Sequence, residues 1–218
     1  MRPLVAAVVL STIGFLLAPR AWAADDEAGE FWLNPSVTQS LDGRTSIEME
    51  TAQRFRTDPR DDTFFIRGWI NRDDAAGRAW SFGVEQRWTG PDEEEQRLLQ
   101  QVSYALGPID MRTRFEQRWV STDPDVGLRV RQRVGGSIPM TDGDDAWSLT
   151  GDAEVFVTLQ PTERDGQTGV TRLRTFVGFE RSLGRYDLNL GYLREHDIRK
   201  NGPDRIGHAP FIGFNINF

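Results

Sequence analysis

Arginine and carboxylate side chains occupy every second position along several stretches of this chain. Residues at every second position of a β-strand point to the same side of the sheet, and the residues between them point to the other side. A charged face of this kind can pair opposite charges into a fixed network, or attract anions if arginine is in excess. The residues that show the pattern most clearly are Arg112, Arg114, Glu116, Arg118, Arg129, Arg131, Arg133, Asp152, Glu154, Arg172 and Arg174.

Two interpretations of this charged face follow, and both assume that it lines the lumen of a barrel. The arginines of residues 127–134 are suited to pair with carboxylates on the neighbouring strands. Because barrels of this size have narrow interiors, such pairs would close the lumen, which is the structural interpretation that we favour. If the pairing leaves arginine in excess, the lumen is instead a narrow, porin-like channel for small anionic solutes.

The histidines, His196 and His208, suggest a third and less favoured function, that of a lipid hydrolase. Alternation places both on the lipid-facing side of a barrel, beside the same loop, where a histidine could act as a general base. A catalytic triad also needs a nucleophile and an orienting partner, and the nearest hydroxyl group that the pattern places is that of Thr171. We therefore predict a protein without enzymatic activity and without catalytic residues.

The composition argues against binding sites for cofactors, metals and nucleic acids. The chain lacks cysteine and has a formal net charge of -7 at pH 7, which argues against thiolate metal sites and against nucleic-acid partners. The acidic run of residues 92–95 lacks the spaced ligands and the glycine of a calcium loop, and we interpret it as a solvated loop. We expect no cofactor and no metal site.

The elements that must position the charged residues are β-strands. Alternation of apolar and polar residues extends over about 10–13 positions at a time, whereas strands of globular sheets usually have about 5–6 residues. The breaks between these segments are short and rich in Gly, Pro, Asn and Asp, and none resembles a domain linker. The clearest alternating segments are residues 80–88, 109–119, 126–134, 147–157 and 188–192.

Aromatic residues distinguish a membrane barrel from a soluble sandwich. They gather at the ends of the segments, and Trp80 and Trp88 share one face at a separation of roughly 20 Å along the barrel axis. An apolar belt with an aromatic girdle at each edge fits this spacing. We therefore predict an all-β fold, a transmembrane antiparallel up-and-down β-barrel of the outer-membrane type with about 10–12 strands. The alternating segments number about eleven, whereas bacterial barrels of a single chain have an even number of strands. If this barrel follows the rule, either residues 31–40 lie outside the wall or two strands have been merged into one segment.

The first residues indicate export. Residues 1–23 combine a basic tip at Arg2, an apolar run and an Ala21-Trp22-Ala23 cleavage motif, which is the layout of a cleaved signal peptide. The remaining residues, 24–218, would form a single barrel domain in the outer membrane, in which residues 24–40 are a plug or the first strand. Outer-membrane lipid and lipopolysaccharide would then surround the barrel.

The last residues, FIGFNINF, place Ile212, Phe214, Ile216 and Phe218 on one face of a strand. This segment resembles the terminal strand that the barrel-assembly machinery of the outer membrane recognises. The resemblance implies that the assembly machinery is a partner during insertion. If Phe218 lies in the periplasm, the short links at residues 41–44 and 107–108 lie there too.

A small repeat suggests a family. The motifs AQRF (52–55), EQRW (85–88 and 116–119) and RQRV (131–134) each place an arginine on the polar face. Together with TRLRTFVGFERSL (171–183) and DLNLGYL (187–193), they resemble the bacterial outer-membrane barrels grouped as domain of unknown function 2490. The resemblance implies a barrel in the outer membrane and carries no established activity.

Overall fold

The computed structural model describes residues 26–143 and 146–218, and the predicted signal peptide lies outside these ranges. The described residues form eleven β-strands and no helix, so they contain no helix that could cross a membrane. The strands are β1 (Asp26–Ser40), β2 (Thr45–Arg56), β3 (Thr63–Asp73), β4 (Ala79–Thr89), β5 (Glu93–Leu106), β6 (Ile109–Val120), β7 (Gly127–Pro139), β8 (Ser148–Gln160), β9 (Gly169–Leu183), β10 (Tyr186–Asp197) and β11 (Arg205–Asn217).

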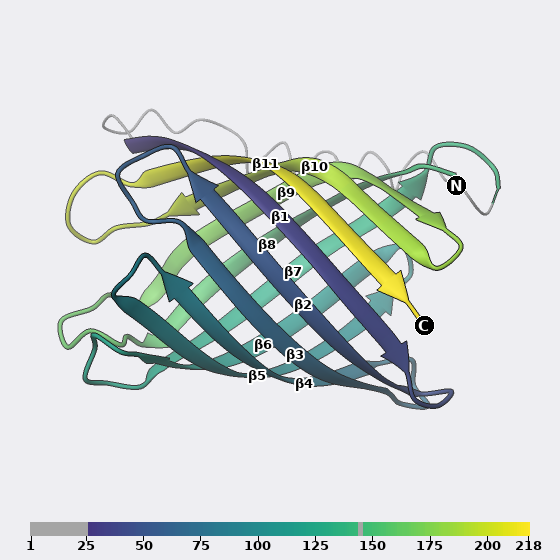
Figure 1. The fold of residues 1–218 in the computed structure, drawn as a ribbon, viewed down its shortest axis with the longest axis horizontal. Helices are drawn as coiled ribbons and strands as arrows, with labels where there is room; N and C mark the ends of the chain where they lie inside the picture. The colour runs from purple at the N-terminus through teal and green to yellow at the C-terminus, as the bar shows by residue number, and fades with distance from the viewer. Residues whose placement is uncertain (1–25, 144–145) are drawn as a thin grey trace.

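The strands follow one another around a closed barrel, and each pairs with its neighbours in the sequence in antiparallel fashion (Figure 1). The barrel closes between β1 and β11, which run parallel to each other. The prediction of an up-and-down barrel of the outer-membrane type is thus confirmed, with one parallel seam. The barrel has eleven strands and not ten or twelve. Strand β1 is part of the wall, because it pairs with β2 as well as with β11.

The odd strand number places the start of β1 and the end of β11 at opposite ends of the barrel. We call the end that holds Asn217 the C-terminal end, and the opposite one the loop end (Figure 1). The links at the C-terminal end are residues 41–44, 74–78, 107–108, 140–147 and 184–185, and those at the loop end are 57–62, 90–92, 121–126, 161–168 and 198–204. The predicted short links at 41–44 and 107–108 lie at the C-terminal end, but the longer link 140–147 lies there too.

Glycine permits the tightest turns. In the two-residue links, Gly107 and Gly184 have φ angles of 62° and 63°, a left-handed conformation that favours glycine. In the 74–78 link, the carboxylate of Asp74 accepts hydrogen bonds from the backbone N–H groups of Ala76 and Arg78 and from the side chain of Trp80. The bonds from Arg78 and Trp80 hold the pKa of Asp74 below its usual range.

The outward face is apolar. Trp80, Trp119 and Phe218 are exposed at its edges, as the predicted aromatic girdles require. Between the edges lie exposed aliphatic and aromatic side chains from many strands, which include Ile66, Ile70, Phe82, Val84, Val177, Phe179 and Phe214.

The inward face is not purely polar. Trp32, Phe176, Leu193 and Ala209 form a buried apolar cluster, against which Phe211 packs. Glycines make room for the large rings: a Cβ on Gly191 would lie 2.5 Å from the ring of Phe176. The lumen therefore contains apolar rings between its charged groups.

Candidate functional site in the barrel lumen

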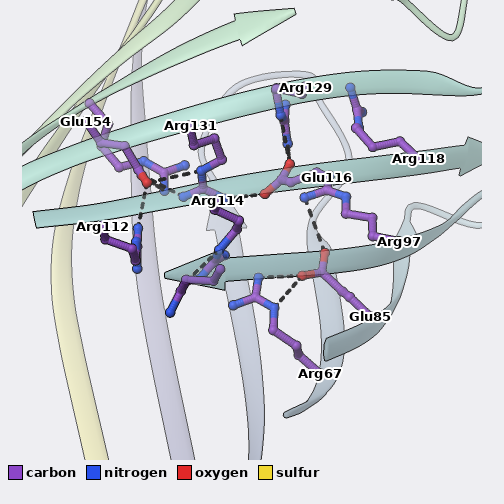
Figure 2. A network of polar contacts seen from close by, with 12 residues as sticks. Arg67, Glu85, Arg97, Arg112, Arg114, Glu116, Arg118, Arg129, Arg131 and Glu154 are labelled. Atoms are coloured by element: carbon purple, nitrogen blue, oxygen red, sulfur yellow. Dashed lines mark hydrogen bonds and ion pairs between the residues drawn. The ribbon is translucent and has the colours of Figure 1, made fainter. Parts of the chain in front are cut away.

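The lumen holds every one of the charged residues that alternation placed on the inner face. Arg112, Arg114, Glu116 and Arg118 project from β6, and the arginines of β7 lie next to them (Figure 2). Asp152 and Glu154 come from β8, and Arg172 and Arg174 come from β9. All of them make polar contacts within the lumen.

Glu116 is the most deeply buried carboxylate of this set, with a side chain that is 0% exposed. Arg129 donates a hydrogen bond of 2.8 Å from Nε to one carboxylate oxygen. Arg131 donates one of 2.9 Å from Nη1 to the other oxygen. Both oxygens of the carboxylate are therefore occupied by arginine, as Figure 2 shows.

Arg131 extends this arrangement to the next strand. Its Nη2 lies 2.6 Å from Glu154, whose other oxygen lies 2.5 Å from Arg112. Arg174 on β9 approaches Glu154 to 3.7 Å and Glu195 on β10 to 2.5 Å. A chain of ion pairs thus runs from β6 through β7, β8 and β9 to β10.

A second chain of ion pairs covers the strands on the other side of β6. Glu85 on β4 accepts a hydrogen bond of 2.7 Å from Nε of Arg67 and lies 3.4 Å from Arg97 on β5. Arg67 also lies 2.8 Å from Glu50 on β2. Glu95 on β5 pairs with Arg97 and with Arg118 on β6, so the ion pairs together link β2 to β10.

Glu95 lies in the barrel wall, so the prediction that residues 92–95 form a solvated loop is wrong for this residue. Strand β5 already begins at Glu93, so Glu95 belongs to the wall and points inward, with only 3% of its surface exposed. It lies 2.5 Å from Arg97 and from Arg118. The run of four acidic residues hides this position, because a charged run lacks the apolar alternation that marks a strand.

Glu30 and Asp197 are lumen residues that sequence reasoning missed. Glu30, on β1, is 7% exposed and lies 2.7 Å from Arg60 of the 57–62 link. Asp197, at the end of β10, forms ion pairs with Arg172 and Arg205. Both sit next to the links of the loop end, where the sequence shows turn formers rather than alternation.

Two buried arginines have no carboxylate partner among the described residues. Arg114 is 4% exposed and donates hydrogen bonds of 2.9 and 2.7 Å to the neutral side chain of Gln101. Arg54 is 7% exposed, and its guanidinium carbon lies 3.8 Å from the ring centre of Trp32. Two positive charges in the lumen therefore lack a paired carboxylate.

The lumen is hollow toward the C-terminal end. A cavity of about 680 Å³ is lined there by residues that include Ser36, Glu48, Asp187 and Asn215. A second cavity of about 400 Å³ lies against the arginines of the ion-pair chains. The two cavities share the lining residues Asn34, Glu50, Glu180, Asn189 and Phe211.

The histidines lie on the outward face, as alternation predicted, but they do not form a triad. His196 Nε2 is 2.8 Å from Asp204, and His208 Nδ1 contacts the hydroxyl group of Tyr192. Burial favours a raised pKa for Asp204, but hydrogen bonds from Arg199 and His196 lower it on balance. The hydroxyl group of Thr171 bonds instead to Thr158, at 2.9 Å. Within the described ranges, no serine or threonine hydroxyl contacts either histidine.

The predicted assembly signal forms the end of the barrel wall. Ile212, Phe214 and Ile216 lie on the outward side of β11, and Phe218 follows its last residue. Phe214 and Phe218 are exposed, at 37% and 56%. In the parts of the chain that the structure describes, no group of three or more His, Cys, Asp or Glu side chains is arranged to hold a metal ion.

Comparison with known proteins assigns the family. A protein of Methylorubrum extorquens, described as uncharacterized, is 27% identical over 187 residues, which cover 81% of this chain and 82% of that protein. Residues 29–206, from β1 into β11, match a family described as "Protein of unknown function (DUF2490)". The resemblance inferred from the repeated arginine motifs is confirmed, and the chain belongs to this family of unknown function, DUF2490.

Proposed function

We propose that this protein is a non-enzymatic, structural or accessory β-barrel of the bacterial outer membrane, with a lumen that paired charges close to ions. The observation that carries the proposal is the full burial of Glu116 between Arg129 and Arg131. A carboxylate that is inaccessible to water and held by two guanidinium groups cannot serve as part of an open, hydrated path.

The energetics of buried charges support a structural role. Removal of one partner of a buried ion pair costs about 3–5 kcal/mol, because the remaining charge is left without compensation. Many of the pairs in this barrel join different strands, as Arg131 of β7 does with Glu116 on β6 and Glu154 on β8. The network therefore resists separation of the strands.

The outer face supports the location. Its exposed apolar side chains and aromatic edges match the requirements of a lipid bilayer. The signal peptide predicted for residues 1–23 favours export, and the terminal residues Ile212 to Phe218 favour recognition by the barrel-assembly machinery. In this proposal the outward face contacts lipid and lipopolysaccharide, and the C-terminal end faces the periplasm.

A narrow channel for small anions is the second candidate. The unpaired charges of Arg54 and Arg114 favour it, because an arginine without a carboxylate partner attracts anions.

Conductance in a planar bilayer separates the two candidates. We expect the refolded protein to insert and to remain electrically silent under a salt gradient, with heat-shifted gel mobility and protease resistance as the controls for insertion. Discrete current steps that favour anions would contradict the closed lumen. Such steps would establish the channel if the replacements Arg129→Gln, Arg131→Gln and Arg133→Gln weakened them.

A further inference from the structure

Arg54 is the least compensated charge of the lumen. Its Nε is buried and has no hydrogen-bond partner, and none of the ion pairs among residues 26–143 and 146–218 includes this side chain. A buried guanidinium group without an anion is unfavourable, because burial removes the water that would otherwise stabilise its charge. No carboxylate among the described residues forms an ion pair with Arg54, so its environment favours a further anion.

The ring of Trp32 fixes the geometry of this arginine. The guanidinium carbon of Arg54 lies 3.8 Å from the ring centre, so one flat face of the group is covered. Arg174 lies over the same ring at 4.8 Å, but it is already paired with Glu195. A planar guanidinium group held by its face keeps its N–H edge free for a carboxylate or phosphate group.

The cavity of about 400 Å³ provides the space. Both Arg54 and Arg114 line it, together with Trp32 and Phe65. Arginines outnumber carboxylates in its lining: the arginines are Arg54, Arg67, Arg112, Arg114, Arg131, Arg133 and Arg174, and the carboxylates are Glu50, Asp110, Asp152, Glu154 and Glu180. Three of these arginines are paired with carboxylates outside the lining, whereas Arg54 and Arg114 form no ion pair among the described residues. These two cations favour an anion, and the volume suits a small molecule.

Access comes from the C-terminal end, because this cavity shares five lining residues with the wider cavity of about 680 Å³ there. We propose that the cavity binds a small soluble oxyanion, a carboxylate or phosphate compound, through Arg54, with Arg114 as its second uncompensated cation. This is a binding function within a closed lumen, and it needs no conduction across the membrane.

The test is binding of two probes, inorganic phosphate and succinate, to the refolded full barrel in a zwitterionic detergent at constant ionic strength. We expect saturable binding of at least one probe by titration calorimetry, together with a rise of the thermal midpoint that follows its concentration. Arg54→Gln should weaken binding by about tenfold or more, and Arg114→Gln should weaken it by a smaller factor. Preference for one probe identifies the oxyanion as phosphate or carboxylate.

Two further variants keep the result interpretable. Arg185→Gln makes the same change of charge at a residue that lines neither cavity, and it should leave binding unchanged. Arg54→Lys retains the charge without the planar fork, so it should bind with intermediate affinity. Because Arg54→Gln breaks no ion pair, the probe-free variant should unfold at the temperature of the wild type or above it. Absence of saturable binding to the wild type, or equal weakening by Arg185→Gln, would overturn the proposal.

Discussion

At the scale of single residues, the lumen depends on carboxylates that each hold more than one arginine. Glu116 holds Arg129 and Arg131 and is fully buried, whereas Glu180 lies in the wall of the open cavities and forms no ion pair among the described residues. The two glutamates therefore allow the same substitution to be compared in a closed and in an open environment.

Glu116→Gln should lower the free energy of unfolding by about 3–5 kcal/mol, because the amide leaves buried Arg129 without a carboxylate and leaves Arg131 with Glu154 alone. Urea unfolding of the refolded barrel in detergent, followed by tryptophan fluorescence, measures this change. Glu180→Gln is the matched control, and we expect it to change the free energy by at most about 0.5 kcal/mol. Equal effects of the two substitutions would show that the network does not stabilise the barrel.

At the scale of elements, the seam between β1 and β11 is the unusual contact, since it is parallel while every other strand pair is antiparallel. Pro210 in β11 lacks an N–H group, and the register of the seam is interrupted beside it, between Gly29 and Trp32 of β1. Parallel pairing is slightly weaker per residue, so this seam is the place where the closure of an eleven-stranded barrel can be tested.

A disulfide across the seam tests the pairing. Val37 and Ile216 are register partners on the outward face, and paired strands lie about 4.8 Å apart, within the Cα separation that a disulfide bridges. Val37→Cys with Ile216→Cys should therefore form an intramolecular disulfide under mild oxidation, visible as a shift in non-reducing gel mobility. Because the chain has no cysteine of its own, no other disulfide can form within one molecule.

The control for this experiment moves one cysteine along β1. Leu33 pairs with Ile212, four residues before Ile216, so Leu33→Cys with Ile216→Cys places the two thiols roughly 13 Å apart. We expect no disulfide in this variant. Oxidation of the control pair in place of the Val37 pair would mean a different register or a different closure.

At the scale of the whole molecule, the odd strand number fixes the two ends of the barrel relative to the chain. Asp92 lies in a link at the loop end and Gly43 in a link at the C-terminal end, and both residues are exposed. Our proposal places the loop end outside the cell. In intact cells, a bulky membrane-impermeant maleimide should therefore label Asp92→Cys and not Gly43→Cys.

Permeabilisation of the outer membrane provides the control, because it should make Gly43→Cys reactive without changing the labelling of Asp92→Cys. Labelling of Gly43→Cys alone in intact cells would show the opposite orientation. Labelling of neither variant before permeabilisation would contradict surface exposure of the loop end.

Alternation along the chain was sufficient to predict the direction of most side chains. A period of two puts Arg129, Arg131 and Arg133 on one side of β7 and Val130 and Val134 on the other, because neighbouring Cβ atoms of a strand point to opposite faces. Strand length and aromatic edges then predicted a membrane-type barrel. The repeated arginine motifs indicated the family that the comparison confirmed.

The tertiary structure alone decided the closure of the barrel and the partner of each charge. Which carboxylate faces a given arginine depends on the register and stagger of strands far apart in the sequence, such as β1 and β11, and a local pattern carries no information on either. For this reason the sequence left open whether pairing leaves arginine in excess, and only the folded barrel shows that Arg54 and Arg114 are buried without a carboxylate partner among the described residues. Likewise, Glu95 became a lumen residue because pairing with β4 and β6 extends β5 beyond the reach of its alternating residues.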